Sequence, residues 1–256
     1  MSNLRKPPRK RRHRPGQEIR RKPRFSRELA VLYEDDAVIA VNKPAGLLAV
    51  PVESSDTPSA LSLLIADLKP RGRKAFVVHR IDRFTSGVLL FAKSHADRES
   101  LIRQFLAHTP VREYLAVVRG HLTEKIGTLV HYFRREGQFQ ILSHERDHKA
   151  ARAEMRYSVE RTLRNASLVR AQLVTGLQNQ IRVQFSAIGH PVIGDRKYHA
   201  AEAKESRIAR VALHAARLEF VHPRTRKTVS ISCELPSDFR SLIQGLQAPP
   251  RKKRTS

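Results

Sequence analysis

The 256-residue chain has a single cysteine, Cys233, no tryptophan, and no long run of apolar residues. One cysteine excludes an intrachain disulfide and is typical of proteins of a reducing compartment. No run approaches the roughly 18 apolar residues of a membrane-spanning helix, and the basic N-terminus lacks the apolar stretch of a secretory signal. We therefore expect a cytoplasmic protein that is not held in a membrane. A basic targeting sequence for an organelle or the nucleus is the alternative interpretation of the N-terminus.

Acidic residues are scarce, because 24 Asp and Glu stand against 49 Lys and Arg, for a net charge of +25. This excess of positive charge predicts a polyanionic partner, and nucleic acid is the usual one. The alternative is a charged surface that only promotes solubility.

The basic residues are concentrated at the two ends of the chain. Residues 1–27 contain twelve Lys and Arg, one Glu and four Pro, and residues 251–254 are all basic. Segments with so little apolar surface cannot offset the entropy lost on ordering. We expect a disordered basic N-terminal arm over residues 1–29, one folded domain over 30–246, and a disordered basic tail over 247–256.

Between the arms, short apolar runs rich in β-branched residues alternate with a few helical patterns. The expected helices cover residues 59–68, 95–107 and 180–188, and the expected strands cover residues 37–41, 88–93, 114–118, 155–162, 167–175, 213–220 and 228–233. Ser94 is the expected N-cap of the second helix, which we expect to bury Leu101, Ile102, Phe105 and Leu106. Hairpin-like neighbours outnumber strand–helix–strand crossovers. The predicted fold class is therefore α+β, with a mixed, mostly antiparallel sheet flanked by helices.

The most informative segment covers residues 79–87 and leads directly into the apolar strand at 88–93. It places one carboxylate, Asp82, between Arg80 and Arg83. A carboxylate so placed can be kept ionised and held in position by the rigid strand behind it. The alternative is a turn or strand-end Asp82 paired with Arg83 at the surface.

A metal site is a weaker interpretation of the twelve histidines. His144, Asp147 and His148 lie close together in the sequence, and His79 lies three residues before Asp82. The chain has no cysteine cluster and no ligand spacing such as His-Glu-x-x-His. We expect no metal.

Four further segments accompany the Asp82 segment in a fixed order. They are residues 34–46 with the pair Lys43-Pro44, residues 112–120 with Tyr114, residues 173–198 with Arg182, and residues 213–223. Together the five segments resemble the motifs of the RluA-like family of RNA pseudouridine synthases and span roughly residues 31–239. The resemblance implies the pseudouridine synthase catalytic fold, with residues 30–246 as the catalytic domain.

The resemblance also implies an activity, the isomerisation of uridine to pseudouridine in RNA. No net oxidation or hydrolysis occurs, so neither a cofactor nor a metal is expected. The implied partner is structured RNA, with ribosomal RNA as the first choice and transfer RNA as the second, and we expect a monomer. Asp82 takes the catalytic role, either attacking C1′ or removing a proton from C2′; the sequence leaves both open.

Further residues receive roles by the same resemblance. Arg182 pairs with Asp82, Tyr114 stacks on the target base and assists removal of the C5 proton, and Arg80 fills the gap left by the flipped uridine. The alternatives are a solvated helix arginine for Arg182, a sheet aromatic for Tyr114 and a structural role for Arg80.

Three more residues complete the expected substrate site. Lys43 belongs to a scaffold turn under the site, Tyr198 closes the wall of the pocket, and Arg83 follows the catalytic carboxylate.

The late segment departs from the family pattern Gly-Arg-Thr-His-Gln-Ile-Arg. Leu177 stands in place of the first arginine, Asn179 in place of the histidine, and Gln184 in place of a second common histidine. These changes put RNA affinity and choice in doubt. A non-catalytic RNA-binding or ribosome assembly protein on the same scaffold is therefore the competing hypothesis, although it does not explain why Asp82, Tyr114 and Arg182 are all retained.

Overall fold

The computed structural model describes residues 29–53, 57–199, 201–202 and 205–247. Apart from residues 29 and 247, the predicted basic arm and tail lie outside the described residues. No helix in these ranges has the length and apolar character needed to cross a membrane.

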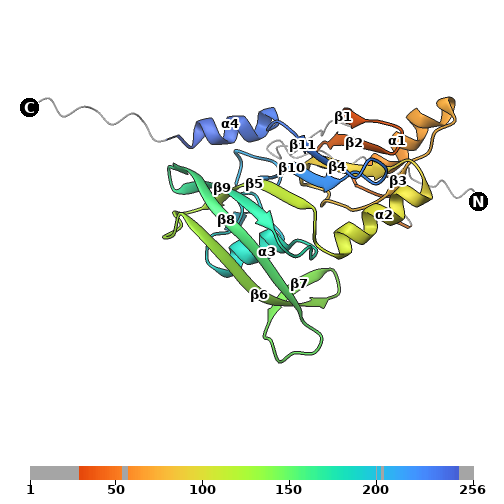
Figure 1. The fold of residues 1–256 in the computed structure, drawn as a ribbon. Coiled ribbons are helices and arrows are strands. Elements are labelled where there is room, and N and C mark those ends of the chain that lie inside the picture. The colour runs from red at the N-terminus through yellow and green to blue at the C-terminus, as the bar shows by residue number, and fades with distance from the viewer. Residues whose placement is uncertain (1–28, 54–56, 200, 203–204, 248–256) are drawn as a thin grey trace, which may run out of the picture.

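The described residues form a mixed sheet with helices packed against it (Figure 1). The strands are β1 (Ala30–Glu34), β2 (Val38–Lys43), β3 (Phe76–Val77), β4 (Ser86–Ala92), β5 (Val111–Arg119), β6 (Ile126–Glu136), β7 (Phe139–Ser143), β8 (Ala151–Leu163), β9 (Ala166–Leu173), β10 (Leu213–Val221) and β11 (Thr228–Ser232). The helices are α1 (Ala60–Leu68), α2 (His95–Leu106), α3 (Gln180–Ala187) and α4 (Ser237–Gly245), with a 3₁₀ turn over Lys69–Arg71.

The strand order is β1-β2-β4-β10-β5-β9-β8-β6-β7, with β11 beside β10 and β3 beside β4. Among the strand pairs of the described chain, only β4 and β10 run parallel. The mostly antiparallel sheet that the sequence predicts is therefore confirmed. Figure 1 shows β10 and β5 at the middle, where the two halves of the sheet meet.

In the first half, β2 and β4 each contain a continuous apolar run, over residues 38–41 and 88–92, because helices cover both of their faces. One face, which includes Ile39 and Phe91, packs against Leu64 and Leu68 of α1. The other face packs against Leu101 of α2. The side chain of Ser94 caps α2, as predicted, by accepting a hydrogen bond from the Asp97 N–H at 3.1 Å.

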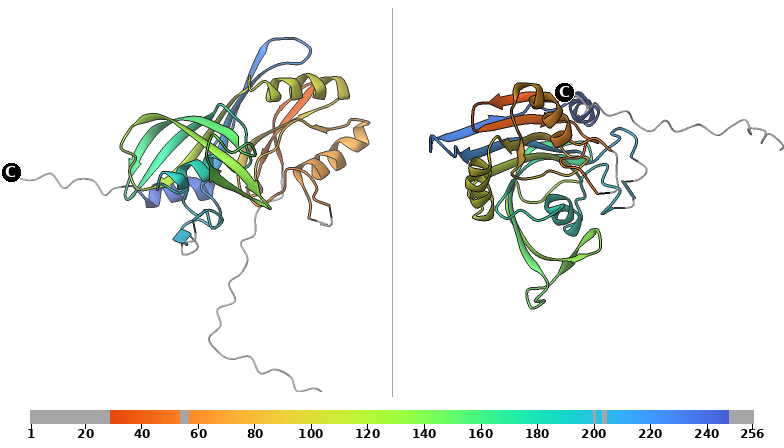
Figure 2. Two further views of the ribbon diagram at one scale, coloured as in Figure 1. Left: turned by 90° about the horizontal axis from the view of Figure 1, so that it is seen from below. Right: turned by 90° about the vertical axis from the view of Figure 1, so that its right-hand side faces the viewer.

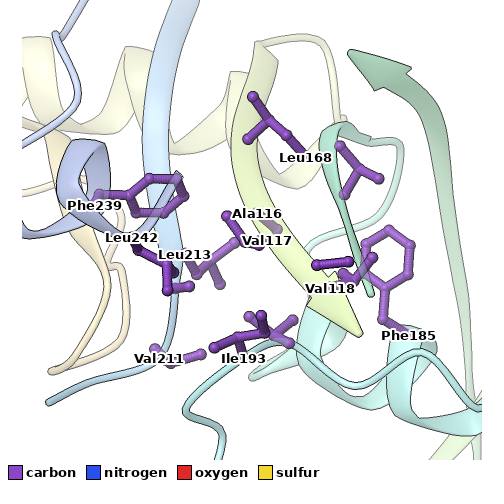
Figure 3. Close-up of a cluster of buried hydrophobic side chains, with 14 of the residues drawn as sticks. Ala116, Val117, Val118, Leu168, Phe185, Ile193, Val211, Leu213, Phe239 and Leu242 are labelled. Atoms are coloured by element: carbon purple, nitrogen blue, oxygen red, sulfur yellow. The ribbon is translucent and has the colours of Figure 1, made fainter. Parts of the chain in front are cut away.

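In the second half, α3 and α4 pack against β5, β9 and β10 around one large apolar cluster. Figure 3 shows Phe185 of α3 on one side of β5, and Phe239 and Leu242 of α4 beside Leu213 of β10. The curved strands of this half and α3 lie together in the two views of Figure 2. The cluster fixes α3, and therefore Arg182, relative to the middle of the sheet.

One predicted core residue is wrongly placed. Leu106 continues the apolar period of α2, but its side chain is 74% exposed because it is the last residue of the helix and no element covers it. It lies instead in the lining of the cavity that contains Asp82, described below.

The parallel pairing of β4 with β10 requires a glycine directly after the Asp82 segment. Gly87 has φ +114° and pairs with Ala215. A Cβ atom at Gly87 would lie 2.1 Å from the Ala215 carbonyl oxygen, so a larger residue would push the strands apart. This close approach holds the start of β4 at the middle of the sheet.

Candidate active site

Asp82 lies in the loop between β3 and β4. The Thr85 N–H donates to the Asp82 carbonyl oxygen at 3.1 Å, which forms a tight turn before β4 begins. The Asp82 side chain is 27% exposed and lines a cavity of about 440 Å³. The carboxylate is thus held by a rigid strand and open to a ligand, as the sequence predicts.

Arg182, in the first turn of α3, reaches Asp82 from the other half of the sheet. Its Nη1 lies 3.5 Å from Asp82 Oδ2. The same guanidinium donates to both carboxylate oxygens of Asp195, from Nε at 2.7 Å and from Nη2 at 2.6 Å. Nη1 also donates to Asn179 Oδ1 at 2.8 Å. Two neighbours, Asp195 and Asn179, therefore hold the guanidinium beside Asp82.

The charge of Arg182 is maintained in a buried setting. Burial lowers its pKa, but the hydrogen bonds and charge of Asp195, together with the charge of Asp82, outweigh burial and raise the pKa above its ordinary value. Arg182 therefore places a permanent positive charge 3.5 Å from the Asp82 carboxylate.

Tyr114 lines the same cavity from β5. Burial raises the pKa of its phenol to about 12, and the charge of Asp82 acts in the same direction while Arg112 opposes it. The hydroxyl is therefore protonated at neutral pH. An aromatic ring in the wall of a cavity beside a carboxylate can stack on a base placed there.

Arg80 is exposed and lines the mouth of the cavity. Within the described part of the chain it takes part in no hydrogen bond or ion pair. Its guanidinium is available to RNA.

The structure does not bring the remaining expected substrate residues to the cavity wall. Lys43 is fully buried and donates to the carbonyl oxygens of Pro44, Leu47 and Arg83 at 3.0, 2.8 and 3.1 Å. Burial lowers the pKa of Lys43 to about 7, against the opposing charge of Asp82. Lys43 thus ties the turn of residues 43–47 to the Asp82 loop.

Arg83 and Tyr198 also contact the site from outside the cavity. The Arg83 Nε donates to the Gly46 carbonyl oxygen at 3.0 Å, and its guanidinium lies over the Phe84 ring. Tyr198 lies behind Arg182, whose guanidinium carbon is 5.1 Å from the centre of the Tyr198 ring. These contacts support the turn and Arg182.

The departures from the family pattern are accommodated by local contacts. Asn179 has φ 56°, a conformation that asparagine adopts more readily than most residues, and its Nδ2 donates to the Tyr198 hydroxyl at 3.0 Å. Leu177 packs near Phe133. The Gln184 Nε2 donates to the carbonyl oxygens of Leu129 and Ala153 at 2.9 and 3.1 Å.

Two functional residues were not assigned a role from the sequence. Asp195 forms the bidentate pair with Arg182, and its side chain is only 1% exposed. Asn179 had been singled out only as a departure. A signal for Asp195 was present, because it is an acidic residue in the same matching segment as Arg182, and arginine forms strong bidentate pairs with carboxylates.

The residues considered for a metal site have other contacts. His79 is half-buried and stacks on Phe105, and its Nε2 accepts from the Leu90 N–H at 3.1 Å. Asp147 accepts from the Ser143 hydroxyl at 2.6 Å. Across the described residues, no group of three or more His, Cys, Asp or Glu side chains is placed to hold a metal ion.

Comparisons with known proteins agree with this geometry. A family model described as RNA pseudouridylate synthase matches residues 37–187. Ribosomal large subunit pseudouridine synthase D of Zymomonas mobilis is 34% identical over 235 residues, which cover 87% of this chain and 74% of that protein. Ribosomal large subunit pseudouridine synthase C of Haemophilus ducreyi is 33% identical over 229 residues, which cover 86% of this chain and 70% of that protein.

A solved structure described as Human RNA Pseudouridylate Synthase Domain Containing 1 has the same fold. It superimposes with a TM-score of 0.67 at 26% sequence identity, over 87% of this chain and 96% of that one. Residues 37–187, which the family model matches, contain Asp82, Tyr114 and Arg182. The resemblance predicted from the sequence motifs is confirmed.

Proposed function

The chain belongs to the RNA pseudouridylate synthase family and is therefore an isomerase; on this premise we propose that Asp82 is its catalytic carboxylate and ribosomal RNA its substrate. Asp82 lines the cavity and forms an ion pair with Arg182 at 3.5 Å, and this pair carries the proposal for Asp82. The names of the Zymomonas and Haemophilus relatives support ribosomal RNA, with transfer RNA as the second choice.

The chemistry requires an anion beside the ribose. The C1′–N1 bond of uridine breaks, the uracil turns, and a C1′–C5 bond forms. Uracil leaves as an anion while positive charge grows at C1′, and an ionised carboxylate at that position can stabilise or trap this charge. Asp82 is the acidic residue that lines the cavity, and the positive charge of Arg182 lies 3.5 Å from its carboxylate.

The target uridine must leave its base stack to reach Asp82. Flipping a nucleotide costs a few kcal/mol. In this proposal, stacking of the base on Tyr114 and insertion of Arg80 from the cavity mouth offset part of that cost. The placement of Tyr114 in the wall and of Arg80 at the mouth supports this division of roles.

The proposal can be tested in cells that lack this protein. Large-subunit ribosomal RNA from such cells is expected to lose at least one pseudouridine, which the unaltered protein restores and Asp82→Asn does not. Asp36→Asn, which alters an exposed carboxylate outside the cavity, is the matched control and is expected to restore it.

Two results would contradict the proposal. Restoration by Asp82→Asn would exclude the catalytic role of Asp82. The non-catalytic RNA-binding hypothesis would be favoured if the protein binds ribosomal RNA but cells that lack it keep every pseudouridine.

A further inference from the structure

The cavity contains two buried polar atoms without a hydrogen-bond partner. They are the Nε of Arg112 and the Oγ1 of Thr85, and no other buried side-chain nitrogen or oxygen of the described residues is left in this state. Both residues line the cavity with Asp82 and Tyr114. A buried donor without a partner is destabilising, and more so when it is charged, so the shared location of these two atoms points to a ligand.

Arg112 is a buried cation without an acidic partner. The residue is 8% exposed, and the one hydrogen bond of its guanidinium goes from Nη2 to the Val174 carbonyl oxygen at 3.2 Å. None of the ion pairs of the described residues includes it, whereas Arg182 has both Asp82 and Asp195. Burial lowers the pKa of Arg112. A charge held at such a cost gains most from an anion that enters the cavity.

The space for this guanidinium depends on Gly176. A Cβ atom at Gly176 would lie 2.5 Å from the Arg112 Nη1. The glycine therefore allows Arg112 to lie against the cavity wall.

The proposed reaction generates an anion that the residues discussed so far leave without a partner. Asp82 stabilises the positive charge at C1′. The electron pair of the C1′–N1 bond, however, leaves with uracil and spreads over N1 and the two carbonyl oxygens. Donors aimed at developing charge in a dry site are among the strongest catalytic effects. His79 also lines the cavity, but burial lowers its pKa to about 3, so its neutral ring brings no positive charge to the anion.

We propose that Arg112, assisted by the Thr85 hydroxyl, donates hydrogen bonds to a carbonyl oxygen of the flipped uracil and stabilises the uracil anion. The inference rests on the proposed function. As the C1′–N1 bond breaks, the bonding pair moves onto the ring; a ring electron pair then forms the C1′–C5 bond, the C5 proton leaves, and N1 gains a proton. The sum is an isomerisation.

The position of Arg112 favours the base over a phosphate. Arg112 and Tyr114 are two residues apart on β5, so their side chains point to the same face of the sheet. The proposed stacking of the base on Tyr114 places its edge near Arg112. Exposed residues such as Arg80, at the mouth of the cavity, are placed to contact RNA phosphates instead.

The test is single-turnover pseudouridine formation by Arg112→Met, with RNA affinity measured in parallel. Removing one donor to a developing oxyanion lowers the rate about 10²–10³-fold, and we expect a loss of that order with the RNA Kd and its salt dependence unchanged. Arg98→Met is the matched control, because Arg98 also donates to a carbonyl oxygen, of Val77 at 3.1 Å, but lies outside the cavity wall.

A second substrate separates a catalytic role from a structural one. The second substrate is RNA with 5-fluorouridine at the target position, in which the fluorine stabilises the leaving anion. Because this base has no C5 proton to lose, the quantity measured is the single-turnover rate of glycosidic bond cleavage. The rate loss from Arg112→Met is expected to be several-fold smaller with this RNA. Arg112→Lys keeps the charge without the planar fork and is expected to show the same trend with a smaller loss, which preserves the test if Arg112→Met folds poorly.

Three outcomes would overturn the inference. An unchanged rate would exclude the role, and equal losses with uridine and 5-fluorouridine would make Arg112 structural. A loss confined to the Kd, with a salt slope lower by about 0.7, would assign Arg112 to a phosphate. In each case pseudouridine formation by the unaltered protein leaves the proposed function standing, whereas no pseudouridine from the unaltered protein would remove both.

Discussion

Replacement of Asp195 by asparagine removes the main anion that holds Arg182 in place. Asp195 is 1% exposed and Arg182 10% exposed, so the substitution leaves a guanidinium buried without its bidentate partner. Breaking a buried pair on one side costs about 3–5 kcal/mol. Asparagine keeps one acceptor oxygen and Asp82 remains 3.5 Å away, so we expect the lower limit, about 3 kcal/mol. At roughly 2–4 °C per kcal/mol for a chain of this size, Tm falls by about 6–12 °C.

The same substitution is expected to affect the rate without affecting RNA binding. Asp195 is too deeply buried to contact RNA, but a misplacement of Arg182 by about 1 Å can cost about 10²-fold in rate. The assays are urea unfolding, RNA titration and single-turnover pseudouridine formation. The control is Asp97→Asn, because Asp97 is also buried and paired bidentately, to Arg224 at 3.0 and 2.7 Å, but Arg224 is half exposed.

Asp97→Asn leaves no cation buried, so we expect a cost of about 1 kcal/mol or less and an unchanged rate. The reasoning is refuted if Asp195→Asn and Asp97→Asn behave alike in stability and in rate. It is also refuted if Asp195→Asn weakens RNA binding as strongly as it slows the reaction.

Three further predictions follow from particular contacts. Asn179→Gly keeps the positive φ but removes the acceptor for Arg182, and single-turnover kinetics are expected to slow about tenfold, since a hydrogen bond to a charged group contributes about 1.5–3 kcal/mol; an unchanged rate would dismiss Asn179 as a positioning residue. Gly87→Ala is expected to yield little folded protein, because its Cβ would overlap the neighbouring strand; a normal melting curve would contradict this. Burial lowers the pKa of His79 to about 3, so below about pH 6.5 the unfolded chain binds a proton that the folded chain does not. Stability from neutral His79 is present above that pH and falls by up to about 2 kcal/mol between pH 7 and 5; urea unfolding of His79→Gln should lack that part of the slope, and equal slopes would contradict it.

Helices α1 to α3 and the central strands were predictable because their signals are local. The apolar period of 95–107, with Ser94 before it, is sufficient to start α2, and the continuous apolar run of β4 predicts burial on both faces. Leu106 was wrongly predicted to be buried because periodicity indicates a face of the helix, not how far along that face another element extends. The strands β1, β3, β6 and β7 and the helix α4 were not predicted. β3 has only two residues, and β6 and β7 alternate exposed and half-buried residues and depend on pairing for their stability.

The candidate site shows the same limit. Asp82, Tyr114 and Arg182 were identified from motifs, and the structure brings them together. The network behind Arg182 depends on the φ of Asn179 and on the loop that carries Asp195, which motif spacing does not determine. The missing partner of Arg112 is equally invisible in the sequence, because the absence of a contact is a property of the folded chain.

The most direct measurement compares purified Asp82→Asn with the unaltered protein on one ribosomal RNA transcript, recording RNA affinity and single-turnover pseudouridine formation side by side. Loss of a catalytic carboxylate is expected to slow the reaction by about 10⁴-fold or more, while the Kd stays within about threefold, because one partly exposed carboxylate contributes little to phosphate binding. A variant that forms pseudouridine within about tenfold of the unaltered rate would contradict the account.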